Sequence, residues 1–171
     1  MNKLDTLFII LTSAVEKGLT EDQVNNRLKR NRIPVSPEIM EYVYQSFTMF
    51  HYSINRYQGQ ILSVKYRPYW QYLCVADNDT DKKHLQLKNK IFLWNDQIWD
   101  SIYPPNSFYC RCTVRSISKM EFESENLKLS YGSNYIEEQY IETGWKFNPG
   151  KTDPNFIKDL LIWKFPILTE L

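Results

Sequence analysis

The spacing of hydrophobic residues changes once along this chain, near residue 59, and this change limits the folds open to it. Up to that point, apolar residues recur at the three- and four-residue intervals of a helix. Two start signals agree: Thr20 has Gln23 three residues on, as in a capping box, and Ser36 stands before Pro37. The sequence therefore predicts three helices, at 4–17 before Gly18, from Thr20 onward, and from Ser36 to about Gly59.

Beyond residue 59 the chain is rich in the aromatic and β-branched residues that favour strands. We predict strands at 61–66, 69–76 and 109–117, a short helix capped by Thr80, a loop over 118–134, and a last helix between Asp153 and Pro166. The expected fold class is α+β: an N-terminal helical arm followed by a small mixed α/β domain with a short sheet and a C-terminal helix. The arm is predicted at residues 1–59 and the domain at 60–171.

The composition excludes several classes of protein. The 171 residues carry a net charge of +1, which gives no general attraction to nucleic acid or to a membrane. No apolar run is long enough to cross a bilayer, and the first residues, with Asp5 early, are expected to form a helix rather than a signal peptide. Three cysteines, an odd number, do not make a disulfide framework. We therefore expect an intracellular protein that folds in a reducing compartment.

Two of the three cysteines flank a single arginine in Cys110-Arg111-Cys112. In a strand, residues two apart share a side, so both thiols would face one way and Arg111 the other. Such a pair is poorly placed to bond to itself but suits a shared partner, namely zinc, with His84 and either Asp77 or Asp79 completing the ligand set. The alternative is that both cysteines are small buried hydrophobes in the core. For Cys74, which shares a strand face with Trp70 and Tyr72, we expect the core.

Three catalytic interpretations can be compared with the residues. A zinc deaminase needs H-x-E and P-C-x-x-C, but His84 is followed by Leu85 and Gln86, and the cysteines are too close together. A Cys/His nucleophile pair needs an orienting third group, which no motif supplies. A nuclease would pair His84 with Asp77 or Glu121 as acid and base. The alternative for His84 is a single structural hydrogen bond.

The segment from Tyr69 to Ser118 resembles the phage Mu F-like minor head protein domain, also called the phage head morphogenesis domain. Members show an aromatic strand leading into an Asp, then Thr, His, a Trp-Asp segment, and Pro-Pro-Asn before Cys-Arg-Cys. The matching positions here are Tyr69, Tyr72, Asp77, Thr80, His84, Asp96, Trp99, Asp100, Tyr103, Pro104, Pro105, Asn106, Cys110, Arg111, Cys112, Val114 and Arg115. The later GWKFNPG, at 144–150, is similar to an Asn-Pro-Gly motif of many members.

This sequence departs from the family pattern at three positions. The usual Arg after the Thr is Asp81, a usual Gly is Asn89, and the usual Asn-Gly turn ends in Ser107. An acid in place of an arginine reverses a local charge, so we expect any site for an anion such as a DNA phosphate to be weakened.

The resemblance implies a non-enzymatic minor head protein that assists capsid or portal assembly, or the packaging and delivery of DNA. Its implied partners are phage portal and capsid proteins, with weak contact to DNA and none to a membrane. The implied location is the virion or procapsid, or the host bacterial cytoplasm. The arm from Leu4 to Gln58 would then dock in a partner's groove, or pack only within its own chain.

The resemblance also implies a set of site residues. The motif cluster expected to bind comprises Asp77, Thr80, His84, Pro104, Pro105, Asn106 and Arg111. The recurrence of His84 with Cys110 and Cys112 strengthens the expectation of zinc. The alternative function is a phage- or prophage-encoded toxin or nuclease-like effector that uses His84, Cys110 and Cys112.

Overall fold

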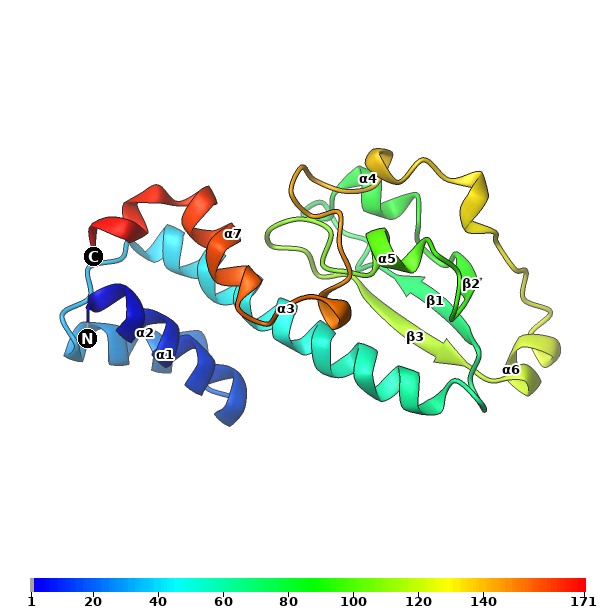
Figure 1. Ribbon diagram of the computed structural model, residues 1–171, viewed down its shortest axis with the longest axis horizontal. Coiled ribbons are helices and arrows are strands. Elements are labelled where there is room, and N and C mark those ends of the chain that lie inside the picture. Colours follow the sequence, from blue (N-terminus) through cyan, green and yellow to red (C-terminus); the bar gives the residue numbers. More distant parts are fainter. Residues whose placement is uncertain (1) are drawn as a thin grey trace. The chain divides into compact units, whose positions relative to one another are not determined.

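The computed structural model describes residues 2–171, which form two compact units. The first unit consists of the chain up to Tyr52 together with Asp153–Leu171, and the second consists of Ser53–Thr152. The long helix α3, Pro37–Ser63, begins in the first unit and ends in the second (Figure 1).

The first unit is entirely helical. It contains α1 (Lys3–Lys17), α2 (Glu21–Arg30), the first part of α3, and α7 (Phe156–Lys164), which a 3-10 turn at Pro166–Glu170 follows. The predicted start signals are confirmed: Thr20 and Gln23 form a capping box, and the Ser36 hydroxyl accepts a hydrogen bond from the N–H of Ile39. The apolar stripes are buried and form the core of this unit: Leu7, Leu11, Val24, Val43, Phe47, Phe50, Ile157 and Leu161.

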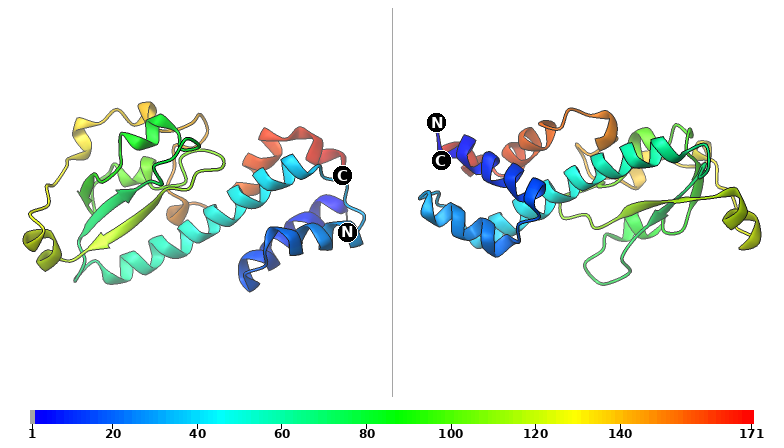
Figure 2. Two further views of the ribbon diagram at one scale, coloured as in Figure 1. Left: turned by 180° about the vertical axis from the view of Figure 1, so that it is seen from behind. Right: turned by 90° about the horizontal axis from the view of Figure 1, so that it is seen from below.

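The second unit contains a three-stranded antiparallel sheet (Figure 2). Its order is β2-β1-β3, with β1 at Tyr69–Leu73, β2 at Ile91–Leu93 and β3 at Thr113–Ile117. The connections carry short helices and 3-10 turns: α4 (Lys82–Leu85), α5 (Trp99–Ile102), α6 (Lys119–Ser124), Gly132–Asn134, Glu137–Gln139 and Pro149–Lys151.

One face of the sheet carries the core of the second unit. Trp70 and Tyr72 point to this face because alternate residues of a strand share a side. The end of α3 packs against it through Tyr57, whose ring centroid lies 5.7 Å from that of Trp70 and 5.2 Å from that of Tyr103. Edge-to-face aromatic contacts of this kind favour a single packing arrangement. The core is completed by Leu87, Phe92, Ile98, Trp99, Ile102, Val114, Tyr140 and Ile141.

Both edges of the sheet are covered by other parts of the unit. On the β3 side, Arg56 and Gln60 of α3 donate to the backbone carbonyl of Val114, at 2.7 and 3.0 Å. On the β2 side, the N–H of Ser130 donates to the carbonyl of Ile91 at 2.7 Å. These bonds occupy backbone groups that an edge strand otherwise exposes.

The prediction that α3 ends at Gly59 and that 61–66 is a strand was wrong. The helix continues to Ser63 because both the nitrogen and the oxygen of the Gln60 side-chain amide are hydrogen-bonded to other parts of the unit. Its Nε2 donates to Val114, and its Oε1 accepts a 2.5 Å hydrogen bond from the Tyr103 hydroxyl. These tertiary contacts outweigh the low helix propensity of glycine.

The strands are also shorter than predicted, and β2, α5 and α6 were not predicted. β1 ends at Leu73, and β3 begins at Thr113, so Cys110 and Cys112 precede the strand rather than lie in it. The predicted loop at 118–134 contains α6, which starts with a capping box between Ser118 and Glu121.

The predicted α+β class, with a short sheet and a C-terminal helix, is confirmed. The boundary predicted after residue 59 followed the sequence pattern alone and lies inside α3, while Asp153–Leu171 belongs to the first compact unit. Among the described residues, no helix is both long and apolar enough to span a membrane.

Candidate functional site

The Pro104-Pro105-Asn106 turn is a buried part of the second unit. The Pro104–Pro105 peptide bond is cis, and both prolines are buried. Asn106 is fully buried, and its Nδ2 donates to the Tyr72 hydroxyl at 2.7 Å and to the last carbonyl of α5 at 3.0 Å. Its own carbonyl accepts from the N–H of Glu142 at 2.9 Å. This turn therefore fixes the start of the segment that carries the two neighbouring cysteines.

His84, Cys110 and Cys112 converge at the end of that segment. Nδ1 of His84, on α4, lies 3.6 Å from Sγ of Cys110 and 3.8 Å from Sγ of Cys112. All three residues are buried, and their potential ligand atoms lie within 4.8 Å of one another. The structure thus brings together the three residues for which zinc was predicted; zinc itself stays a prediction.

Cys74 lies beside the same cluster, which the sequence did not indicate. It follows the last residue of β1 and packs against the core of the second unit, as expected. In addition, its sulfur lies 3.1 Å from that of Cys112 and 3.2 Å from the backbone carbonyl of His84. All three cysteines of the chain therefore meet at one place, and all are free thiols.

The surroundings of these thiols keep them protonated when no cation is near. A hydrogen bond with Cys112, together with burial, raises the pKa of Cys110 well above its ordinary value. A bond with Cys110 lowers the pKa of Cys112, but the bond with Cys74 and burial outweigh it and raise the value to about 12. Because the thiolate is the nucleophilic form, these are not the surroundings of an activated cysteine.

Arg111 points away from the thiols and binds Asp77. Its guanidinium makes two bonds to the Asp77 carboxylate, at 2.8 and 2.5 Å, and a longer contact of 3.4 Å to the Thr80 hydroxyl. The bond from Arg111 lowers the pKa of Asp77, and Arg111 and Thr80 together hold the carboxylate in place. Asp77 is thus a partner of Arg111, and neither it nor Asp79 belongs to the group around His84.

The predicted site residues therefore divide into a buried cluster and an exposed one. Asp77, Thr80 and Arg111 form the second cluster, at the surface, where Asp77 is exposed and the other two are half-buried. The expectation that Thr80 caps α4 was wrong: Asp81 is the cap, through a 2.8 Å bond from the N–H of Lys83. Thr80 instead donates to the carbonyl of Val75 at 2.6 Å. The acid that replaces the family's arginine thus has a structural role in starting the helix of His84.

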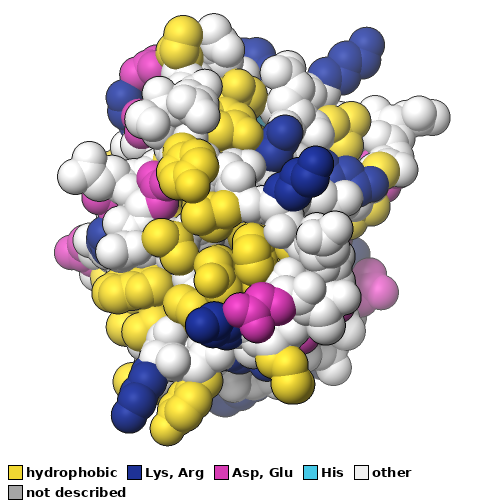
Figure 3. Space-filling model, turned by 90° about the vertical axis from the view of Figure 1, so that its right-hand side faces the viewer, with side chains coloured by type: hydrophobic (Ala, Val, Ile, Leu, Met, Phe, Trp, Pro, Cys, Tyr) yellow, Lys and Arg dark blue, Asp and Glu magenta, His cyan; other side chains and the backbone are white. Residues whose placement is uncertain are grey.

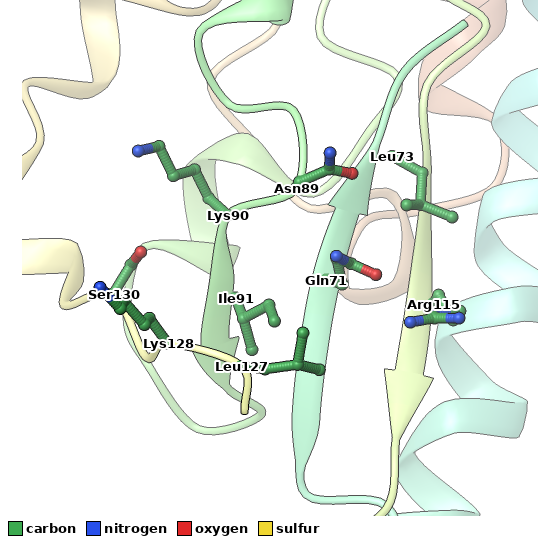
Figure 4. Close-up of a pocket in the computed structure, with 9 residues that line it drawn as sticks. All are labelled: Gln71, Leu73, Asn89, Lys90, Ile91, Arg115, Leu127, Lys128 and Ser130. Carbon is green, nitrogen blue, oxygen red and sulfur yellow. The ribbon is translucent and has the colours of Figure 1, made fainter. Parts of the chain in front are cut away.

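The face of the sheet opposite the core is hollowed into a pocket of about 600 Å³, shown in Figure 4. Side chains of all three strands and of two loops line it: Gln71, Leu73, Asn89, Lys90, Ile91, Arg115, Leu127, Lys128 and Ser130. Three of these residues are basic and none is acidic, and Nε of Arg115 is buried without a hydrogen-bond partner. Sequence reasoning did not find this pocket, because its residues come from four separate segments that share no motif.

Large hydrophobic side chains are also exposed on the second unit. The most exposed are Leu62, Met120, Tyr66, Ile136 and Tyr131. Figure 3, which faces the side where α6 lies, shows hydrophobic side chains in the open among Lys and Arg. Exposed apolar surface beside basic groups is typical of a contact surface for another macromolecule.

Comparison with known proteins gives one family and two curated relatives. The family model described as "Phage Mu protein F like protein" matches residues 7–115. The "Putative capsid assembly protein F" of Escherichia phage Mu is 32% identical over 116 residues, which are 68% of this chain and 26% of that protein. The "Mu-like prophage FluMu F protein" of Haemophilus influenzae is 32% identical over 127 residues, which are 74% of this chain and 30% of that protein. No solved structure matches the chain.

The chain therefore spans less than a third of the length of either curated relative. The match also extends further toward the N-terminus than the motif residues do, since it begins in α1 and ends in β3. It includes all three cysteines, His84 and the helices of the first unit up to α3.

Proposed function

Because the chain belongs to the Phage Mu protein F like family, we propose that it acts in the assembly of a phage head, as a non-enzymatic structural protein. The observation that carries the proposal is the 32% identity to the phage Mu protein named for capsid assembly, over 68% of this chain. The virion or procapsid, and the host bacterial cytoplasm before assembly, are the corresponding locations.

We further propose that the helical unit contacts portal or capsid proteins. Along α1, a groove of about 550 Å³ is lined by residues that include Phe8, Thr12 and Lys158, and the side chain of Ile9 on its rim is 54% exposed. Tyr52 and Trp163 of the same unit are exposed as well. Helices recognise partners through exposed apolar side chains of this kind.

Mass spectrometry of gradient-purified particles and procapsids tests the assembly role. The protein is expected at a low, fixed ratio to the portal protein, and its absence from particles of a productive phage would contradict the proposal. Ile9→Glu is expected to reduce incorporation severalfold, because it places a charge in the apolar contact. Met120→Glu places the same charge on an exposed apolar side chain of the second unit and so compares the contributions of the two units.

We propose that contact with DNA, where the assembly brings it near, is weak. The net charge of +1 gives no general attraction, and the Arg111 guanidinium is already neutralised by Asp77. Lys90, Lys128 and Arg115, around the pocket on the sheet, are the cations available to a phosphate. Binding to a DNA duplex should disappear at moderate salt; tight binding at 200 mM salt, on the order of nanomolar, would contradict this.

The alternative of a toxin or nuclease-like effector would place chemistry at His84, Cys110 and Cys112. The raised pKa values of both thiols and the burial of all three residues argue against it, because a nucleophile needs a thiolate and access to substrate. A growth-inhibition or nuclease activity that His84→Ala abolishes would favour the effector instead.

A further inference from the structure

We propose that Cys74, Cys110, Cys112 and His84 bind one zinc ion, as a four-ligand site that joins three segments of the second unit. This site goes beyond the assembly role and does not depend on it. The ligands come from the end of β1, from α4, and from the segment before β3. A single ion would therefore connect parts of the chain up to 38 residues apart.

The distances around His84 agree with a tetrahedral ion. Zinc lies about 2.3 Å from a thiolate sulfur and about 2.0–2.1 Å from an imidazole nitrogen, so tetrahedral geometry sets the ligand atoms about 3.6 Å (S to N) and about 3.8 Å (S to S) apart. Nδ1 of His84 lies 3.6 Å from Sγ of Cys110 and 3.8 Å from Sγ of Cys112. Both nitrogen-to-sulfur separations thus lie within about 0.2 Å of the value that one ion requires, and the two sulfurs lie within 4.8 Å of each other.

Cys74 is the residue that completes the set. Its sulfur lies 3.1 Å from that of Cys112, closer than two ligands of one ion, but outside the group whose ligand atoms all lie within 4.8 Å of one another. A rotation of the Cys74 side chain, toward the other ligands and away from Cys112, must therefore accompany binding. The residue is only partly buried and lies outside any regular element, which leaves that rotation free. No carboxylate belongs to the group around His84 in the described chain, and Asp77 is already bound by Arg111.

A chain of hydrogen bonds supports the ligands from behind. Asn106 donates to the Tyr72 hydroxyl at 2.7 Å, which directs the hydroxyl proton of Tyr72 toward the neighbouring sulfur of Cys112. Groups that orient a ligand in this way are a regular part of metal sites. The Pro-Pro-Asn turn thus supports the proposed site, because it holds Asn106 where it can donate to Tyr72 and because the two cysteines follow it closely in the chain.

The cluster makes less sense as ordinary core. Three thiols and an imidazole, whose Nε2 is buried without a hydrogen-bond partner, fill a site where apolar side chains would pack without unsatisfied polar groups. A metal bound at Nδ1 would replace the long contacts of 3.6 and 3.8 Å that this nitrogen makes with the sulfurs of Cys110 and Cys112.

The first test is the metal content of the full chain, purified without chelator from a bacterial cytoplasm. Elemental analysis is expected to find close to one zinc per chain. Replacement by Co²⁺ is expected to give the visible absorption of a tetrahedral site, with the intense near-ultraviolet charge-transfer bands of thiolate ligands. Reduced, folded protein that contains no zinc and takes up no Co²⁺ would overturn the proposal, as would a Cys74–Cys112 disulfide in the freshly purified protein.

Variants of three ligands and of one supporting residue test the site further. Cys112→Ser and His84→Ala should lower zinc affinity by more than about 100-fold, and Tyr72→Phe, which removes only support for Cys112, by about 10–100-fold. His51→Gln, at the other histidine, and Arg111→Gln, between the two cysteines but facing away, should bind zinc as the wild type does. Cys74→Ser should weaken binding and reduce the thiolate bands of the Co²⁺ form. Unchanged bands and affinity would remove Cys74 from the set and refute the four-ligand site.

Discussion

The two histidines of this protein show how differently its two units are stabilised. His51, in the helical unit, lies among aromatic rings, with centroids 4.5 Å from Phe47 and 5.8 Å from Phe50. His84, in the sheet unit, lies among thiols. Burial and the charge of Lys158 lower the pKa of His51, whereas at His84 burial is outweighed by Cys110 and the pKa is raised. Packing of the apolar helix faces requires side chains of suitable size and shape. The cluster around His84 requires particular nitrogen and sulfur atoms.

Removal of zinc should produce the largest difference in stability between the two units. A chelator is expected to loosen the sheet unit alone, because the proposed site lies wholly within it. Hydrogen exchange measured by mass spectrometry should then speed up by more than about tenfold in peptides from β1 and β3, and stay unchanged in α1 and α2. Added zinc should restore protection. An equal loss of hydrogen-exchange protection in both units would contradict a zinc site that stabilises the sheet unit alone.

A pair of buried substitutions gives the next largest contrast. Leu11→Met in the helical unit should cost less than about 1.5 kcal/mol, because the volume and polarity of the side chain change little. Asn106→Leu in the sheet unit should cost about 2–3 kcal/mol, since the Tyr72 hydroxyl and a carbonyl of α5 lose their partner. Urea unfolding measures both. Similar values for the two would show that the sheet unit also tolerates replacement by size alone.

The pH dependence of the helical unit should be a smaller effect. The pKa of His51 in the folded protein lies below the ordinary value of 6.5, so the unfolded chain binds more protons as the pH falls past 6.5. The stability that the neutral ring provides is therefore present above this pH and is lost as the pH falls toward the lower, folded value. His51→Phe keeps a ring in the contact and should flatten the thermal-stability profile between pH 7.5 and 5.5, whereas an unchanged slope would assign it to other groups.

The smallest effects should be equal in the two units, because the loss of a helix cap is expected to cost each unit the same free energy of unfolding. Thr20 caps α2 and Ser118 caps α6 through the same capping-box geometry. Thr20→Ala and Ser118→Ala are each expected to cost about 1 kcal/mol, measured by thermal unfolding. Ser133→Ala, at an exposed position without a cap, is the control and should lie within about 0.5 kcal/mol of the wild type.

What the sequence predicts well is what neighbouring residues determine. The starts of α2 and α3 followed from Thr20, Gln23 and Ser36, because a cap acts within one turn. The capping box at Ser118 could be recognised in the same way, but the polar composition of the segment led to the prediction of a loop.

What the sequence could not predict depends on residues brought together by the fold. α3 passes Gly59 because Gln60 meets Val114 and Tyr103, which lie more than 40 residues away. Cys74 joins Cys112 because β1 is the central strand and pairs with β3. Its alternation with Trp70 and Tyr72 indicated the buried side of the strand, but not its neighbours there.

The covered edges of the small sheet have a consequence for copies of this chain that lie close together. Arg56 and Gln60 occupy a backbone carbonyl of β3, and the Ser130 segment does the same for β2. A strand from another molecule would have to displace these groups before it could add to the sheet. These covered backbone groups thereby disfavour the pairing of copies strand to strand, even where their local concentration is high.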